Sequence, residues 1–159
     1  MNLQKILLVL ALAAGLFLCC AAVAGNGQSV LLHLECVQSA SNCIEIPSGL
    51  SAGGGVLIDK TPQMEVTRED IDQAKLEPGP GVDSAVLAVT LKKDSAARFA
   101  SMTRQNVGKR LVVIVGGEVV TAPTINAAIE GGWIRIVIPG GPSGALKKLP
   151  WLMEMVGNR

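Results

Sequence analysis

The chain has 159 residues, with 14 basic and 13 acidic side chains and very few aromatic residues. This length suffices for one compact domain with its own core, and the balanced charge, without a basic block, argues against nucleic acid as the main partner. The scarcity of aromatic side chains also removes the stacking platforms that single-strand binders use.

The beginning of the chain, residues 1–24, has the pattern of a secretory signal peptide. One lysine precedes the apolar run 6–18, and small residues follow it. We expect cleavage after Ala24, which would make the protein exported and periplasmic. Two alternatives stay open. One is an uncleaved N-terminal anchor, because the apolar stretch is close to the ~20 residues that span a bilayer. The other is a lipid anchor on Cys19 or Cys20.

Export would leave Cys36 and Cys43 in an oxidising compartment, where we expect them to form one local disulfide. Closing such a short loop contributes about 2–3 kcal/mol in the chain-entropy model. Two free buried cysteines are the alternative. His33 is the only histidine, so a cluster of metal ligands cannot be completed, and we expect neither a metal nor a cofactor. We expect His33 to be a surface or strand histidine rather than a catalytic base.

Residues 29–37 alternate loosely between apolar and polar side chains and are predicted to form a strand, with 44–46 as its hairpin partner. Residues 47–55 are rich in glycine and serine, which is typical of a linker. We therefore divide the mature chain into an N-terminal strand region with its linker, 25–55, and a main domain, 56–159.

The main domain is predicted to open with a strand at 56–58. Thr67 and Asp70 then form a capping-box pattern, in which each side chain bonds the backbone of the other. This pattern predicts a short helix over 68–75. A strand with alternating Val and Leu is expected over 85–91.

A longer helix is predicted from Asp94, as the N-cap, to about Asn106, because its apolar residues recur at helical spacing. Gly108 fits the left-handed residue that ends such a helix. The continuous apolar run 111–115 predicts a central strand covered on both faces. Gly116 and Gly117 predict a tight hairpin turn that leads into the next strand.

The returning strand 118–121 is expected to end at Pro123. A further strand is predicted over 133–138, with its isoleucines on one side. The last helix is predicted over 143–155, with Pro150 kinking or splitting it. The fold class that follows is α+β, a mainly antiparallel sheet with two or three helices packed on one face.

The last helix also supplies a candidate binding surface, because Met-rich apolar stretches suit adaptable binding. The alternative is core packing, since one side of this helix must be buried. The candidate residues are Trp151, Leu152, Met153, Met155 and, from the preceding strand, Trp133.

Residues 66–138 resemble the head subdomain of the first periplasmic domain of SecD, the accessory subunit of the Sec protein translocase. The residues that carry the resemblance have structural roles, as helix stops, turn formers, a strand end and a core side chain. They are Phe99, Asn106, Gly108, Gly117, Ala122, Pro123, Gly131 and Gly132. None of these residue types in this pattern points to catalysis.

The resemblance implies a non-enzymatic, exported module that engages polypeptide, with an envelope protein or Sec translocase components as partners. A periplasmic binder of small molecules or envelope ligands on the same scaffold is the alternative. The chain departs from the family at Gly116, where the family has an aspartate, and at 139–159, which lacks the family's Gly-Phe-Thr entry. Past the leader, no apolar run is long enough for a transmembrane helix, so we expect membrane contact only if the leader stays uncleaved.

Overall fold

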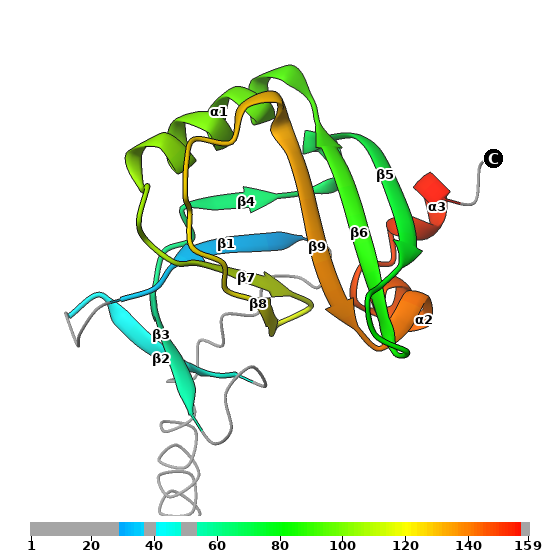
Figure 1. The fold of residues 1–159 in the computed structure, drawn as a ribbon, viewed down its shortest axis with the longest axis horizontal. Coiled ribbons are helices and arrows are strands. Elements are labelled where there is room, and N and C mark those ends of the chain that lie inside the picture. The colour runs from blue at the N-terminus through cyan, green and yellow to red at the C-terminus, as the bar shows by residue number, and fades with distance from the viewer. Residues whose placement is uncertain (1–28, 37–40, 49–53, 157–159) are drawn as a thin grey trace, which may run out of the picture.

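The computed structural model describes residues 29–36, 41–48 and 54–156, and these form an α+β fold, as predicted (Figure 1). The predicted signal peptide and most of the predicted linker lie outside the described residues. The strands are β1 (Val30–Leu34), β2 (Cys43–Pro47), β3 (Gly55–Asp59), β4 (Met64–Val66), β5 (Ile71–Pro78), β6 (Ser84–Leu91), β7 (Leu111–Val115), β8 (Glu118–Thr121) and β9 (Trp133–Pro139). The helices are α1 (Lys93–Gln105), α2 (Gly141–Lys148) and α3 (Leu152–Val156), with single 3-10 turns η2 (Arg68–Asp70) and η3 (Glu130–Gly132).

The strands of the described residues form three antiparallel sheets rather than one. A four-stranded sheet has the order β4-β1-β7-β8, a three-stranded sheet has the order β5-β6-β9, and β2 pairs with β3 in a two-stranded ribbon. The strands of the two larger sheets cross at a steep angle (Figure 1).

The main core lies between the two larger sheets. Leu32 from β1, Leu87 from β6 and Ile136 from β9 are buried in it. Helix α1 closes one end with Phe99, and α2 and α3 close the opposite end, where α3 buries Leu152 (Figure 1). Each large apolar side chain buried in this way contributes about 1.5–3 kcal/mol.

A second, smaller core lies on the other face of the four-stranded sheet, under the β2–β3 ribbon. Leu31, Val112 and Ile114 pack there against Val56 and Ile58 of β3. Strand β7 is therefore buried on both faces, which confirms the prediction from its continuous apolar sequence.

The predicted disulfide between Cys36 and Cys43 is present and ties the end of β1 to the start of β2. The hairpin predicted between 29–37 and 44–46 is wrong. Both edges of β1 are occupied, by β4 and by β7, so β2 pairs instead with β3. The partners of β1 are far away in sequence, and no local pattern could identify them.

The helix predicted over 68–75 is also wrong, because only the turn η2 is helical and the chain then continues as β5. Strand β6 supplies the backbone hydrogen bonds that a helix would have made internally. The residues 73–77 in fact alternate between polar and apolar side chains, and this period of two was the missed signal.

The other predicted helices are present, but their ends and continuity differ from the prediction. Lys92, not Asp94, is the N-cap of α1. The C-terminal helix is divided into α2 and α3 around Pro150, as the proline predicted. Within the described part of the chain, no helix has both the length and the apolar character needed to cross a membrane.

Candidate functional site

A cavity of about 660 Å³ lies where the ends of the three sheets meet. Strand β8 contacts both β9 and β2 beside it. The lining residues are Ile46, Pro47, Asp83, Ser84, Gly117, Glu118, Val119, Val120, Val137 and Pro139. We refer to this cavity as the edge groove.

The walls of the edge groove are largely apolar. Val119 and Val120 are buried in β8, whereas Val137 of β9 is 41% exposed. Ile46 is half-buried at the opposite wall. An apolar hollow with a few polar groups at its rim is the usual form of a binding site in proteins.

Two strand edges border the edge groove, because β8 and β9 are each the last strand of their sheet. Among the described residues, no strand pairs with the outer edge of either. Such an edge presents backbone N–H and C=O groups that can pair with an added strand. The groove therefore combines apolar walls with backbone hydrogen-bonding groups.

The turn between β7 and β8 shapes the rim of this groove. Gly116 and Gly117 both have positive φ, of 59° and 80°, which confirms the predicted tight turn. A Cβ at residue 116 would lie 3.0 Å from Lys148 Cβ, and Lys148 forms an ion pair with Glu118 at the rim. A larger residue at position 116 would therefore crowd α2, and the positive φ also favours glycine there.

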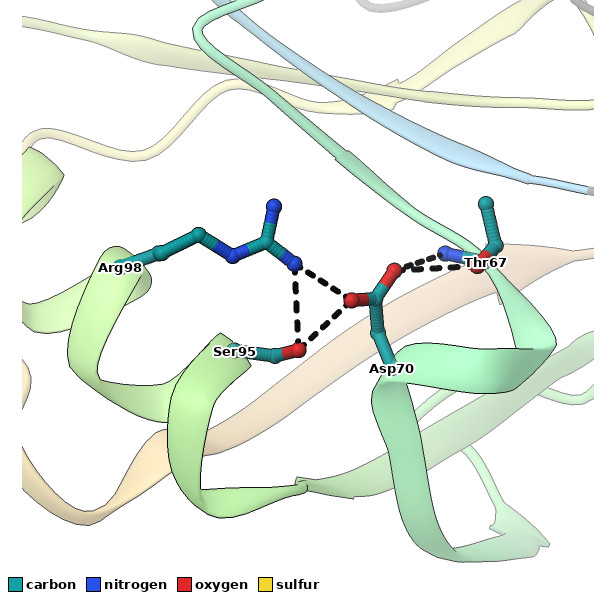
Figure 2. A network of polar contacts seen from close by, with 4 residues as sticks. All are labelled: Thr67, Asp70, Ser95 and Arg98. Atoms are coloured by element: carbon teal, nitrogen blue, oxygen red, sulfur yellow. Dashed lines mark hydrogen bonds and ion pairs between the residues drawn. The ribbon is translucent and has the colours of Figure 1, made fainter.

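A separate polar network joins η2 to α1 (Figure 2). One carboxylate oxygen of Asp70 accepts hydrogen bonds from the Thr67 N–H at 2.9 Å and from the Thr67 hydroxyl at 3.0 Å. The other oxygen accepts the Ser95 hydroxyl at 2.6 Å and an Arg98 guanidinium N–H at 2.5 Å. The predicted capping box is thus confirmed and extended by α1.

These contacts favour the ionised form of Asp70. Burial by itself raises the pKa of Asp70, but the hydrogen bonds from Ser95 and Thr67 and the charge of Arg98 outweigh it and lower the pKa below its usual value. Both carboxylate oxygens are occupied, so Asp70 is held as a structural anion and has no oxygen left to act as a general base.

His33 lies in β1 and is fully buried, so it is a strand histidine but not a surface one. Its Nδ1 is 2.7 Å from the backbone oxygen of Asp59, and its Nε2 has no hydrogen-bond partner among the described residues. No group of three or more His, Cys, Asp or Glu side chains that could hold a metal ion occurs in the described part of the chain.

The residues of the candidate binding surface do not form one surface. Trp151 is only 8% exposed, Leu152 is fully buried, and Met155 packs against the same core. Met153 is 64% exposed on α3, and Trp133 is 75% exposed on β9. The buried members follow the core-packing alternative, because α3 is the element that closes this end of the core.

The residues that carry the family resemblance lie at structural positions. Phe99 is buried in the main core, and Asn106 caps α1 through its side-chain N–H, which donates to the Met102 oxygen at 2.9 Å. Strand β8 ends at Thr121, as predicted, but the backbone pairing does not stop at Pro123, because Thr124 bridges to Arg110 and the Ile125 N–H donates to the Lys109 oxygen. A proline cannot donate, but its oxygen accepts from the Leu111 N–H. The Arg110 Nε–H donates a hydrogen bond to the Ala122 oxygen. Three of the glycines that carry the resemblance, Gly108, Gly131 and Gly132, have positive φ.

The edge groove itself was not predicted from the sequence. Its residues come from β2, β8, β9 and the start of β6, which only the tertiary structure brings together. One signal was available at Val137. It lies between the inward isoleucines of β9, at an outward position where a solvated strand usually carries a polar side chain.

The family model of the SecDF P1 head subdomain matches residues 45–144 of this chain. The protein translocase subunit SecDF of Thermus thermophilus is 46% identical over 54 residues, which cover 34% of this chain and 7% of that protein. The protein translocase subunit SecD of Desulfurispirillum indicum is 31% identical over 84 residues, covering 50% of this chain and 16% of that protein. The chain thus spans only a small part of the length of these relatives.

Solved structures of SecDF share the fold. One, described as a membrane component that enhances protein export, has a TM-score of 0.50 at 21% identity and covers 74% of this chain and 57% of the solved chain. A second, in a super-membrane-facing form, has a TM-score of 0.51 at 20% identity, with coverages of 77% and 18%.

Proposed function

This chain belongs to the SecDF P1 head subdomain family, and from that membership we propose that it is a non-enzymatic module of protein translocation that engages polypeptide. We further propose that it is exported and acts in the periplasm, beside components of the Sec translocase. The observation that carries the proposal is the edge groove, in which apolar walls lie between two strand edges that no other described strand pairs with.

The client polypeptide would bind by strand addition. An extended segment of a client chain would pair its backbone with β9 or β8, because each edge presents unsatisfied hydrogen-bonding groups. Alternate side chains of the segment would then enter the groove against Val137 and Val119. Backbone pairing does not depend on client sequence, which suits a module that must accept many unfolded chains.

A substitution at the groove tests this proposal. We expect Val137→Lys to weaken binding of a fluorescent, permanently unfolded polypeptide about tenfold or more, measured by fluorescence anisotropy. The charge would enter the apolar wall, and edge lysines oppose strand addition. Val137 is 41% exposed, so the variant should keep its fold, which circular dichroism would verify.

The matched control is Val107→Lys, at a similarly exposed valine after α1 that does not line the groove. This control should bind as the unmodified protein does. Equal binding by the Val137 and Val107 variants, or no binding of unfolded polypeptide by the unmodified protein, would remove the support for the edge groove as the working site.

A further inference from the structure

Trp133 lies on the outer face of the three-stranded sheet, away from the main core. Its side chain is 75% exposed, whereas the other two aromatic residues of the described chain, Phe99 and Trp151, are buried. Trp133 pairs with Thr90 in the sheet register. A Cβ built on Gly131 would lie 3.7 Å from the indole Cδ1, so the ring rests beside a glycine backbone. An exposed indole presents a large flat apolar face with a polar edge.

A hollow of about 340 Å³ adjoins the indole on this same face. The hollow forms because Ala88 and Thr90 of β6, whose side chains point outward, are small. Side chains with hydrogen-bonding groups surround it: Gln73, Lys75 and Glu77 from β5 and Arg135 from β9. The site therefore combines one flat apolar wall with a ring of donors and acceptors.

The charged side chains around this hollow leave it with a net positive charge. Arg135 and Glu77 neutralise each other in an ion pair of 2.8 Å that crosses β6. Lys75 is exposed and makes no ion pair among the described residues, so one positive charge is left uncompensated. From strand and residue spacings, the Cα atoms of Lys75 and Trp133 lie roughly 12 Å apart, diagonally across the sheet.

We propose that this face binds an oligosaccharide that carries a carboxylate group. The C–H face of one sugar ring would stack on the Trp133 indole, whose ring face is electron-rich. Hydroxyl groups would bond Gln73 and Thr90, and the carboxylate of a neighbouring sugar would pair with Lys75. Flat rings rich in hydroxyl groups match a shallow hollow with one apolar wall and several polar side chains.

A polypeptide fits this face less well. In the middle of a sheet, backbone N–H and C=O groups are already paired, so an added chain would find no backbone partners over Ala88. This ligand site is also separate from the edge groove, since none of its residues lines that cavity. The ligand site beside Trp133 can therefore be tested independently of the proposed function.

Intrinsic fluorescence gives a direct test, because the chain has two tryptophans and Trp151 is buried. Titration with oligogalacturonate should change the emission of Trp133, and added salt should weaken this binding. Trp133→Ala should reduce the affinity about tenfold, measured by calorimetry. Lys75→Gln should reduce it about threefold and abolish most of its dependence on salt.

Two matched variants control these results. Met153→Ala removes another exposed apolar side chain, and Lys147→Gln removes another exposed lysine, both outside the hollow. Neither should change the affinity. Uncharged chito-oligosaccharide should bind more weakly than oligogalacturonate and be indifferent to Lys75→Gln. The proposal would be overturned by no binding of oligogalacturonate, by equal binding by Trp133→Ala, or by equal affinity for both sugars. Binding of unfolded polypeptide, but not of sugar, that depends on Trp133 would overturn it too.

Discussion

Gly132 and Gly108 both have positive φ, of 68° and 86°, but their surroundings differ. A Cβ at Gly132 would lie 2.5 Å from Ala96 Cβ and 3.2 Å from Leu91 Cβ, whereas a Cβ at Gly108 would meet nothing within 4 Å. Gly132 is therefore required for the close packing of η3 on α1. Gly108 is required only for the backbone angle.

This difference in surroundings predicts different losses of stability for alanine substitutions at the two glycines. Gly108→Ala should destabilise the protein by about 1 kcal/mol, the cost of a left-handed alanine. Gly132→Ala should cost about 3 kcal/mol, because the overpacked contact with α1 adds to that strain. Denaturant unfolding of the two variants measures both. Equal losses would show that the chain around Gly132 moves aside without cost.

Two exposed apolar side chains show that residue type alone does not predict which site a residue belongs to. Val137 and Trp133 lie on the same strand and the same outward face, two rows apart, yet they line different cavities. Trp151, which the sequence marks as a binding candidate together with Trp133, is in the core. Residue type alone does not distinguish these cases, because burial is decided by the neighbouring elements.

Between elements, the Asp70 network holds η2 against the first turn of α1 (Figure 2). We expect Asp70→Asn to destabilise the protein by about 2 kcal/mol at pH 7, since an amide cannot accept at both atoms and hydrogen bonds to a charged group are the stronger ones. Asp72→Asn, at an exposed position of β5, is the control and should stay within about 0.5 kcal/mol of the unmodified protein.

The pH dependence follows from the lowered pKa of Asp70. Its stabilising effect is complete above the unfolded value, near 3.8, and is lost as the pH falls through the lower folded value. The stability difference between the unmodified protein and Asp70→Asn should therefore shrink in acid below about pH 4. Unfolding curves measured from pH 7 to pH 2 test this. A difference that stays constant over that range would contradict the assignment.

At the scale of the whole molecule, backbone pairing crosses the division that we place at residue 55. Strand β1 lies before it and pairs with β4 and β7, and β2 pairs with β3 across it. We expect a fragment of residues 56–159 to be unfolded, because the four-stranded sheet would lose the strand between β4 and β7. A fragment of residues 29–159 should fold. Circular dichroism and cooperative thermal unfolding compare them, and a cooperatively folded 56–159 fragment would support the division.

The sequence alone determined the elements whose signals are local. The strands β6, β7, β8 and β9, the helix α1, the Gly116–Gly117 turn, the capping box and the disulfide all follow from residue period, turn chemistry or cysteine spacing. These signals depend on neighbours within a few residues. They were also sufficient for the resemblance to the SecD head, because the residues that carry it stop helices and form turns.

The tertiary structure alone decided which strands pair and where the cavities lie. β5 carries a local strand period, but its pairing with β6 is set by the fold, and β2 joins β3 because both edges of β1 are occupied. The edge groove and the hollow beside Trp133 are built from residues separated by many tens of positions. The physical reason is the same in each case. Pairing between strands that do not follow each other in the chain, and the cavities between such strands, depend on partners distant in sequence that no local pattern identifies.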